Sequence, residues 1–353
     1  MDRLSIIQSF LKHGVQINQG ALDILLKDPQ TLEKALKIKN LPSIITTDFL
    51  KPIYRGTEET EQLTINSLTQ VLSHRYNFLR NILMNKPELV NLISINKIRD
   101  KLQQFSVIGS VFEKSEILIL EDPTGQGEFK VDKELAKYIV EDEVVGAICE
   151  RDGNTNKITE IIYPDIPMRR DAKSMKSSQE YIFISNLDIT QSYHNEIYFK
   201  NFLEWARQHK NIKIIISGNF QKTQDFTKFT SSLPSNIEIH DERGRIYIGD
   251  MEILLMESTL LKNYMQVLGT NTEETIITLL KKRNLNPTLS PNSYSNSLLL
   301  ENIPDIIIVE DADIPTTFNY KGITIAISGN FNTQPSYWII NLQTRETLKI
   351  NFS

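Results

Sequence analysis

The sequence predicts an α/β protein in three parts: a small helical domain, a five-stranded β-barrel and an α/β sandwich. Three observations indicate this fold class. Residues 181–220 read as a strand, an amphipathic helix and a second strand, a βαβ unit that requires parallel pairing. Residues 105–164 carry five short β-rich segments with one helical segment between the third and the fourth. Residues 1–53 carry only short amphipathic helical patterns.

Composition limits the class of protein. The chain has 353 residues, 40% hydrophobic and 24% charged, enough for two or three globular cores. No apolar run approaches the roughly 20 residues that a membrane helix needs, and the single cysteine, Cys149, excludes an intramolecular disulfide. We therefore expect a cytoplasmic protein without membrane contact. The net charge of −5 disfavours an independent DNA binder, so we expect contact with DNA only through a complex.

The first hundred residues are predicted to be mostly helical. Residues 1–53 form a helical N-terminal domain, with one apolar face over positions 4–11, another over 22–26 and a third short helix from Thr31. Residues 54–100 are predicted to be a linker and a connecting helix. The polar stretch 54–63 has no periodicity, whereas positions 65–84 place apolar side chains on one helical face.

Residues 101–167 are predicted to be an OB-fold domain. Strands are expected over residues 106–111, 117–120, 128–131, 144–149 and 157–163, with a helix over 135–140, and this order is that of the OB-fold. Gly109 inside the first strand suggests a bulge or bend at a barrel corner. Aromatic residues are few and acids are plentiful, which favours contact with protein over binding of single strands.

Residues 168–353 are predicted to contain the sandwich. The basic residues Arg169, Arg170, Lys173 and Lys176 at its start read either as a solvated linker or as a contact for phosphate or an acidic partner. Buried strands are expected over residues 181–185, 212–216, 253–256 and 306–309. The loops after such strands carry the chemistry in open α/β sheets.

Those loops give the first resemblance to a known family. The strands and their spacing resemble binuclear metallophosphoesterases of the calcineurin type, which hold two metal ions with Asp, Asn and His ligands after successive strands. The ligands differ here: Asn186, Asp188, Asn219, Glu257, Asp311 and Asp313 occupy the degenerate ligand positions. The Gly-Asn-His triplet of the family has no counterpart, and none of the five histidines falls at a ligand position.

The chain also resembles the small (B-type) subunits of replicative DNA polymerases, above all that of the archaeal family D enzyme. The resemblance is carried by the segments RYNFL at 75–79, EDPTG at 121–125, LLKKRNLNP at 279–287 and PDI at 304–306. It implies a degenerate calcineurin-like phosphoesterase domain in residues 168–353. It also implies a non-catalytic accessory subunit that scaffolds a polymerase large catalytic subunit, with no catalytic residue and no cofactor expected.

Two alternatives remain open. Asp188, Asp311 and Asp313 could gather a Mg²⁺ or Ca²⁺ weakly together with Asn186 and Asn219, because hard cations prefer oxygen ligands. The chain would then be a metal-dependent 3′–5′ exonuclease or phosphodiesterase with a rebuilt carboxylate site. A structural adaptor unrelated to replication is the other alternative.

Overall fold

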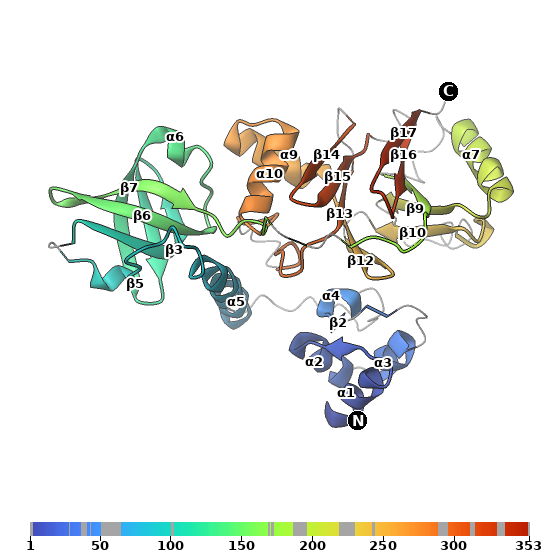
Figure 1. The fold of residues 1–353 in the computed structure, drawn as a ribbon, viewed down its shortest axis with the longest axis horizontal. Helices are drawn as coiled ribbons and strands as arrows, with labels where there is room; N and C mark the ends of the chain where they lie inside the picture. Colours follow the sequence, from blue (N-terminus) through green and yellow to red (C-terminus); the bar gives the residue numbers. More distant parts are fainter. Residues whose placement is uncertain are drawn as a thin grey trace. The chain divides into compact units, whose positions relative to one another are not determined.

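The computed structural model describes residues 3–27, 29–36, 41–42, 44–50, 65–99, 102–168, 170, 173–185, 196–218, 230–241, 244–288, 296–310, 315–329 and 336–351. The chain divides into two compact units. Figure 1 draws their helices and strands, coloured along the sequence. The first comprises Met1–Glu59, Arg169–Ser258 and Pro304–Ser353, and the second Thr60–Met168 and Thr259–Ile303. Among the described helices, none has the length and apolar character needed to cross a membrane.

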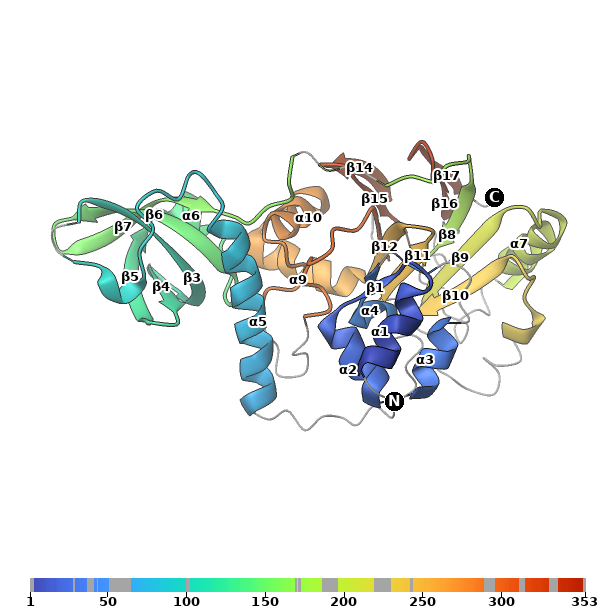
Figure 2. The same cartoon turned by 60° about the horizontal axis from the view of Figure 1, so that its bottom comes forward.

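The N-terminal part of the first unit is helical, as predicted (Figure 2). Ile6 and Phe10 are buried on one face of the first helix, and they share a core with Leu25, Ile45 and Leu50. A parallel pair of two-residue strands was not predicted, because two residues are too few to leave a period in the sequence. The elements are α1 (Arg3–Leu11), β1 (Gln16–Ile17), α2 (Gln19–Lys27), α3 (Pro29–Leu36), β2 (Ile44–Ile45) and α4 (Thr47–Leu50).

Two five-stranded sheets form most of the rest of the first unit. One sheet has the order β10-β9-β8-β16-β17, and the other has the order β11-β12-β13-β15-β14. The strands of the first are β8 (Glu180–Ile184), β9 (Lys213–Gly218), β10 (Ile237–Asp241), β16 (Ser336–Asn341) and β17 (Thr347–Asn351). Those of the second are β11 (Gly244–Ile248), β12 (Met251–Met256), β13 (Ile306–Val309), β14 (Thr316–Tyr320) and β15 (Ile323–Ile327).

The predicted βαβ unit is confirmed. β8 and β9 pair in parallel and are connected through α7 (Glu196–Gln208). Alternation along β8 gives the strand two buried faces. Ile182 and Ile184 pack on the apolar face of α7, and Phe183 packs between the two sheets with residues of β12 and β13. The mixed α/β architecture predicted for this part of the chain is therefore observed.

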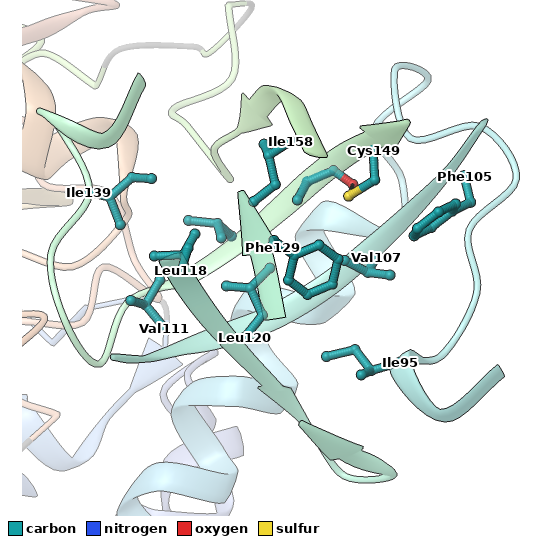
Figure 3. Close-up of a cluster of buried hydrophobic side chains, with 12 residues drawn as sticks. Ile95, Phe105, Val107, Val111, Leu118, Leu120, Phe129, Ile139, Cys149 and Ile158 are labelled. Carbon is teal, nitrogen blue, oxygen red and sulfur yellow. Dashed lines mark hydrogen bonds between the residues drawn. The ribbon is translucent and has the colours of Figure 1, made fainter. Parts of the chain in front are cut away.

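The second unit contains a closed ring of five strands in the order β3-β4-β5-β7-β6. β5 and β7 pair in parallel and the other neighbours are antiparallel. The inside of the ring is filled by inward side chains such as Val107, Leu118, Phe129 and Cys149 (Figure 3). The strands are β3 (Gln104–Lys114), β4 (Ile117–Asp122), β5 (Gly125–Val131), β6 (Val144–Asp152) and β7 (Thr155–Ile162).

Two details predicted for this ring were wrong, the bounds of the helix and a bulge at Gly109, while the alternative of a bend at Gly109 stays a prediction. The helix between the third and fourth strands is α6 (Lys133–Ala136), earlier and shorter than the predicted 135–140. Gly109 lies in regular pairing with Val145, and the bulge falls between Val111 and Glu113 instead. Gly109 serves close packing: a Cβ there would lie 3.0 Å from the Leu120 Cβ and 3.2 Å from the Glu121 carbonyl oxygen.

Helices complete the second unit. α5 packs on the outer faces of β3 and β6, where Leu79 and Leu83 share a cluster with Ile108 and Val144. Asn271 caps α10, since its side-chain oxygen accepts the Glu274 N–H at 2.9 Å. The elements are α5 (Ile65–Leu83), the 3₁₀ turn η1 (Ile95–Lys97), α9 (Ser258–Leu268) and α10 (Thr272–Lys281).

Candidate functional site

The six predicted ligand positions follow, in the sequence, the carboxyl ends of two pairs of parallel strands. β8 pairs with β9 in one sheet, and β12 pairs with β13 in the other, with Met256 level with Val309. The loops after each pair therefore begin at the same edge of their sheet. Five of the six predicted positions lie outside the described residues: Asn186, Asp188, Asn219, Asp311 and Asp313. Glu257 is described, directly after β12, and is half-buried.

Three described residues at the carboxyl ends of these sheets have side-chain oxygen atoms that could act as metal ligands: Ser185, Glu310 and Ser328. Glu310 follows β13 and is buried, and its N–H donates to the Met256 carbonyl at 2.9 Å. Ser185 and Ser328 follow β8 and β15 and are buried too, and their hydroxyls find no hydrogen-bond partner within the described part of the chain. Carboxylates and hydroxyls are hard ligands. Across the same described residues, no group of three His, Cys, Asp or Glu side chains is placed to hold a metal ion.

Histidines in the described ranges have other roles. His240 lies on β10, level with Ser217 of β9, and its Nε2 lies 3.7 Å from a Glu238 carboxylate oxygen. The neighbouring His240 ring is the main cause that lowers the pKa of Glu238. His209 stacks on Trp205 with ring centroids 4.3 Å apart, and His74 lies 3.4 Å from a Glu301 carboxylate oxygen.

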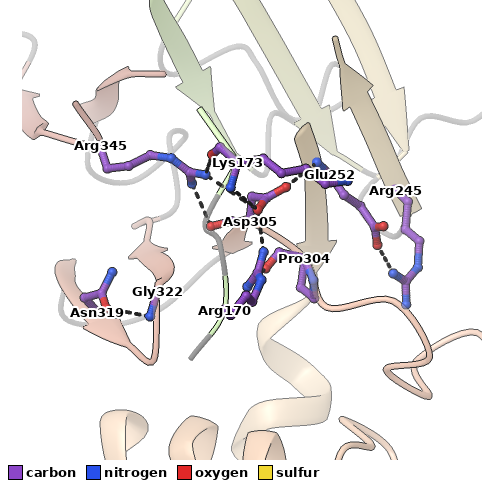
Figure 4. A network of polar contacts seen from close by, with 9 residues as sticks. All are labelled: Arg170, Lys173, Arg245, Glu252, Pro304, Asp305, Asn319, Gly322 and Arg345. Carbon is purple, nitrogen blue, oxygen red and sulfur yellow. Dashed lines mark hydrogen bonds and ion pairs between the residues drawn. The ribbon is translucent and has the colours of Figure 1, made fainter. Parts of the chain in front are cut away.

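A buried cluster of charges lies at the other end of β13 (Figure 4). The Asp305 side chain is 1% exposed and forms ion pairs with Arg170 and Arg345. Its Oδ2 accepts the Glu252 N–H at 3.0 Å, and its Oδ1 accepts the Lys173 N–H at 3.3 Å. Burial lowers the pKa of both arginines, and the charge of Asp305 opposes that shift.

This cluster corrects the interpretation of one residue, Arg170, in the basic segment before β8; Lys173 and Lys176 are exposed, and Arg169 lies outside the described residues. Arg170 is neither a solvated linker residue nor a surface contact for phosphate, because its guanidinium is 12% exposed and paired with Asp305. It also donates to the Pro304 carbonyl at 2.9 Å. The Pro-Asp-Ile segment at 304–306 therefore holds Arg170 in place before β8, and its role is structural. An Asp between a Pro and an apolar strand needs a partner when it is buried, but the sequence does not show which base supplies it.

The LLKKRNLNP segment has a similar role in the second unit. Lys282 forms an ion pair with Glu143 in which each side chain is 1% exposed, and its Nζ also donates to the Tyr138 carbonyl at 2.6 Å. Burial raises the pKa of Glu143 and lowers that of Lys282, and the attraction between the two opposes both shifts. Arg283 donates to the Leu300 carbonyl at 2.9 and 2.6 Å.

The RYNFL segment of α5 contacts the same region. Arg75 is 2% exposed and donates to the Pro287 carbonyl and to the Asn296 side chain. Tyr76 donates to the Ile108 carbonyl at 3.2 Å, and the Phe78 ring lies 5.8 Å from the Arg283 guanidinium. Together with Lys282, these residues connect α5 and the ring to residues 281–288 and to Asn296 through buried polar contacts.

The EDPTG segment is a turn fixed by Asp122. Its Oδ1 accepts the N–H groups of Thr124 at 2.7 Å and Gly125 at 3.2 Å, and its Oδ2 accepts the Ile95 N–H at 2.9 Å. Gly125 has φ +152°, which favours glycine. The turn thus joins β4 to β5 and ties η1 to the ring.

Comparison with known proteins gives two curated relatives. The chain is 32% identical over 153 residues to a protein of Methanothermobacter thermautotrophicus named DNA polymerase II small subunit, covering 40% of this chain and 31% of the relative. It is 27% identical over 193 residues to a protein of the same name from Thermoplasma acidophilum, covering 48% of this chain and 40% of the relative. The matched regions thus span less than half of these relatives. No known family profile matches the chain.

Two solved structures of other proteins show a partial likeness to this chain. One is described as a novel archaeal phosphodiesterase, with 9% identity, 49% of this chain and 99% of that chain covered, and a TM-score of 0.29. Another is Vacuolar Protein Sorting 29 of Cryptosporidium parvum, with 13% identity, 49% and 96% covered, and a TM-score of 0.29. These scores are too low to carry a conclusion. By sequence, the chain is similar over parts of its length to two archaeal proteins named DNA polymerase II small subunit.

Proposed function

We propose that this chain is a non-catalytic accessory subunit of a replicative DNA polymerase and that it scaffolds the large catalytic subunit. The observation that carries the proposal is the similarity to two archaeal proteins named DNA polymerase II small subunit, over 40% and 48% of this chain. The partner is a polymerase large subunit of the archaeal family D type, and DNA is reached only through that complex.

The proposed fold of each part follows the same relatives. The ring is an OB-type barrel, supported by the order β3-β4-β5-β7-β6, by the parallel pairing of β5 with β7 and by the position of α6 between β5 and β6. The two-sheet part is a degenerate calcineurin-like phosphoesterase domain. The proposed domains are a helical domain over residues 1–53, a linker and connecting helix over 54–100, the OB-type domain over 101–167 and the phosphoesterase-like domain over 168–353.

Residue identity supports the absence of catalysis. Glu257 follows β12 where the phosphoesterase pattern has a histidine, and Asn186, Asp188 and Asn219 replace ligands after β8 and β9. A two-metal site must clamp both the attacking and the leaving oxygen, which requires a complete ligand set. We propose that the subunit needs no metal for its role and that any Mg²⁺ or Ca²⁺ is bound weakly.

Buried polar contacts support a scaffolding role. The segments that carry the resemblance place Arg75, Asp122, Lys282 and Asp305 in buried or half-buried contacts within their own units. Such groups are costly to bury and stabilise a single arrangement only when they are paired. These paired contacts therefore support a rigid interior for each of the two units, on which a partner can be held.

Coexpression tests the assignment. The chain is produced with the family D large subunit encoded in the same genome, and the mixture is analysed by size exclusion. We expect one complex at stoichiometric ratio, because lasting hetero-complexes bury large and partly apolar interfaces. Asp311→Asn with Asp313→Asn should leave the complex intact. Elution of the parent chain apart from the large subunit would reject the assignment.

A nuclease assay tests the catalytic alternative. The purified chain is incubated with Mn²⁺ or Mg²⁺ and a 5′-labelled single-stranded or mismatched DNA. We expect no 3′–5′ degradation above that of a heat-denatured sample. Degradation that Asp311→Ala with Asp313→Ala abolishes would establish the rebuilt carboxylate site and contradict the proposal of a non-catalytic subunit.

A further inference from the structure

The outer surface of the strand ring is covered on one side and bare on another. Where α5 lies against β3 and β6, the outward Ile108 and Val144 are buried at 4% and 3% exposure. Further along β3 and on β4, Phe112 is 56% exposed and Ile117 is 37% exposed. The same ring therefore carries two apolar outer regions, and among the described residues only the first has a helix over it.

Strand geometry explains why these side chains point outward. Along β4, Leu118 and Leu120 are buried inside the ring, so alternation turns Ile117 and Ile119 to the outside. On β3 the bulge between Val111 and Glu113 adds one residue, Phe112, next to Ile119 of the neighbouring strand. Three apolar side chains on adjacent strands form a patch, unlike the single exposed apolar residues found on most surfaces.

Acidic side chains surround this patch. Glu113 and Glu128 lie level with Ile119 on the two neighbouring strands, and Glu121 lies two residues further along β4. All three are exposed. Lys130, level with Ile117, is a base on the same face. Lys114 is half-buried, and its Nζ donates to the Ile139 carbonyl at 2.7 Å.

The charge of the whole ring agrees with that of the patch. Residues 104–162 contain 13 Asp and Glu against 6 Lys and Arg, a net charge of −7, whereas the full chain carries −5. A phosphate backbone approaching this surface would be repelled, and a basic protein segment would be attracted. The negative charge of the ring therefore favours a basic protein segment over nucleic acid as its binding partner.

We propose that the Phe112 face, formed by Phe112, Glu113, Ile117, Ile119, Glu121 and Glu128, binds a protein segment that presents apolar side chains flanked by Lys or Arg. The inference rests on the proposed function in placing that segment on the polymerase large subunit. The apolar patch supplies the area removed from water, and the carboxylates select the partner and its orientation. Nucleic acid is not the occupant of this face.

The test measures the affinity of the purified chain for the purified large subunit in 0.1 M and 0.5 M NaCl. Two variants alter the face: Phe112→Ser, and Glu113→Lys with Glu128→Lys. Two controls alter exposed residues of the same unit away from it: Val90→Ser, where the side chain is 62% exposed, and Glu160→Lys on β7. Thermal unfolding of every variant verifies that it is folded.

We expect each face variant to weaken binding at least tenfold in 0.1 M NaCl and each control to stay within twofold. The effect of the charge reversal should shrink in 0.5 M NaCl, because salt screens exposed charges. If both face variants bind like the parent, the Phe112 face is not the interface although the subunit assignment stands. If the parent itself does not bind, the assignment fails and this placement fails with it. Binding of oligo(dT), measured by fluorescence anisotropy and abolished by Phe112→Ser, would make nucleic acid the occupant and overturn the proposal.

Discussion

The Nζ of Lys282 and the carboxylate of Glu143 form a buried ion pair, in which each side chain is 1% exposed. Lys282 follows α10 and Glu143 directly precedes β6, so the pair joins segments 139 positions apart in the sequence. The Nζ also lies 4.4 Å from the centre of the Tyr163 ring. Removing one partner of an ion pair this deep destabilises the fold far more than replacing both partners by apolar residues.

Replacing Lys282 alone should therefore destabilise the second unit strongly. We expect Lys282→Met to lower the free energy of unfolding by about 3–5 kcal/mol, because Glu143 is then left buried without its counter-ion. Adding Glu143→Leu should restore much of that loss. Urea denaturation followed by circular dichroism measures both. Lys157→Met, which breaks the exposed pair with Asp132, is the control and should cost less than about 1 kcal/mol. Equal losses for the two single variants would contradict the buried-pair argument.

Asp305 should be equally important in the first unit. Asp305→Asn removes the charge that faces Arg170 and Arg345, and we expect a loss of about 3–5 kcal/mol in the free energy of unfolding. Amide hydrogen exchange should also accelerate at Glu252 and Lys173, whose N–H groups bond to the Asp305 carboxylate. Asp250→Asn, at an exposed turn two residues before Glu252, is the matched control. Unchanged exchange at both amides would show that the carboxylate does not hold the segment.

Alkaline pH should weaken the second unit through Cys149 and Tyr76. Burial raises the pKa of the Cys149 thiol from 9.0 to about 12 and that of the Tyr76 hydroxyl from 10.0 to about 12. A raised pKa in the folded state gives a stabilising contribution that is complete below pH 9 and is lost as pH rises towards 12. Each group lowers the free energy of unfolding by up to about 1.4 kcal/mol per pH unit in its window.

Urea unfolding at pH 8, 9, 10 and 11 measures this loss. The decline should be shallower for Cys149→Ala than for the parent from pH 9 upward, since that variant has no thiol to ionise in the unfolded chain. The curve for Tyr76→Phe should lie below that of the parent and parallel to it up to pH 10, because the hydrogen bond to Ile108 is lost, and should decline less steeply above pH 10. Parallel curves for the parent and Cys149→Ala would contradict the assignment to the thiol.

Gly109→Ala should destabilise the ring by about 1–3 kcal/mol. The added methyl group would meet the Glu121 backbone, which cannot move without disturbing the β3–β4 pairing. Gly146→Ala is the comparison, because its methyl group would meet the flexible Leu89 side chain at 2.7 Å. Thermal unfolding of the two variants should rank Gly109→Ala as the less stable. The reverse order would mean that the β3–β4 pairing adjusts more easily than Leu89.

Strong periodic patterns made much of the fold predictable. The parallel pairing of β8 with β9 followed from two β-branched runs around one amphipathic helix, and the five ring strands followed from short runs separated by turn residues. The position of α6 was missed because four residues give no helical period. A bulge at Gly109 was wrongly predicted, because sequence does not show what approaches a missing Cβ.

The site was less predictable than the scaffold. The six ligand positions were assigned from motif and spacing, and five of them lie outside the described residues, so both their assignment and their arrangement stay predictions. The buried charges were missed for another reason. Arg170 and Lys282 look like surface bases in the sequence, and only the distant Asp305 and Glu143 make their burial possible. Pairing across more than a hundred positions leaves no local pattern.

The position of β16 in its sheet has a consequence for how this protein folds during its synthesis on the ribosome. β16 lies between β8 and β17, with Trp338 level with Phe183, so the inner strand of that sheet is synthesised some 150 residues after its neighbour. All residues of the second unit have been translated by Ile303, before β16 exists. During that interval a nascent β8 presents an unpaired edge beside apolar side chains, the kind of surface that associates wrongly with other chains. Nascent chains halted before Ser336 should therefore require a chaperone or remain aggregation-prone, whereas release after β17 removes that hazard.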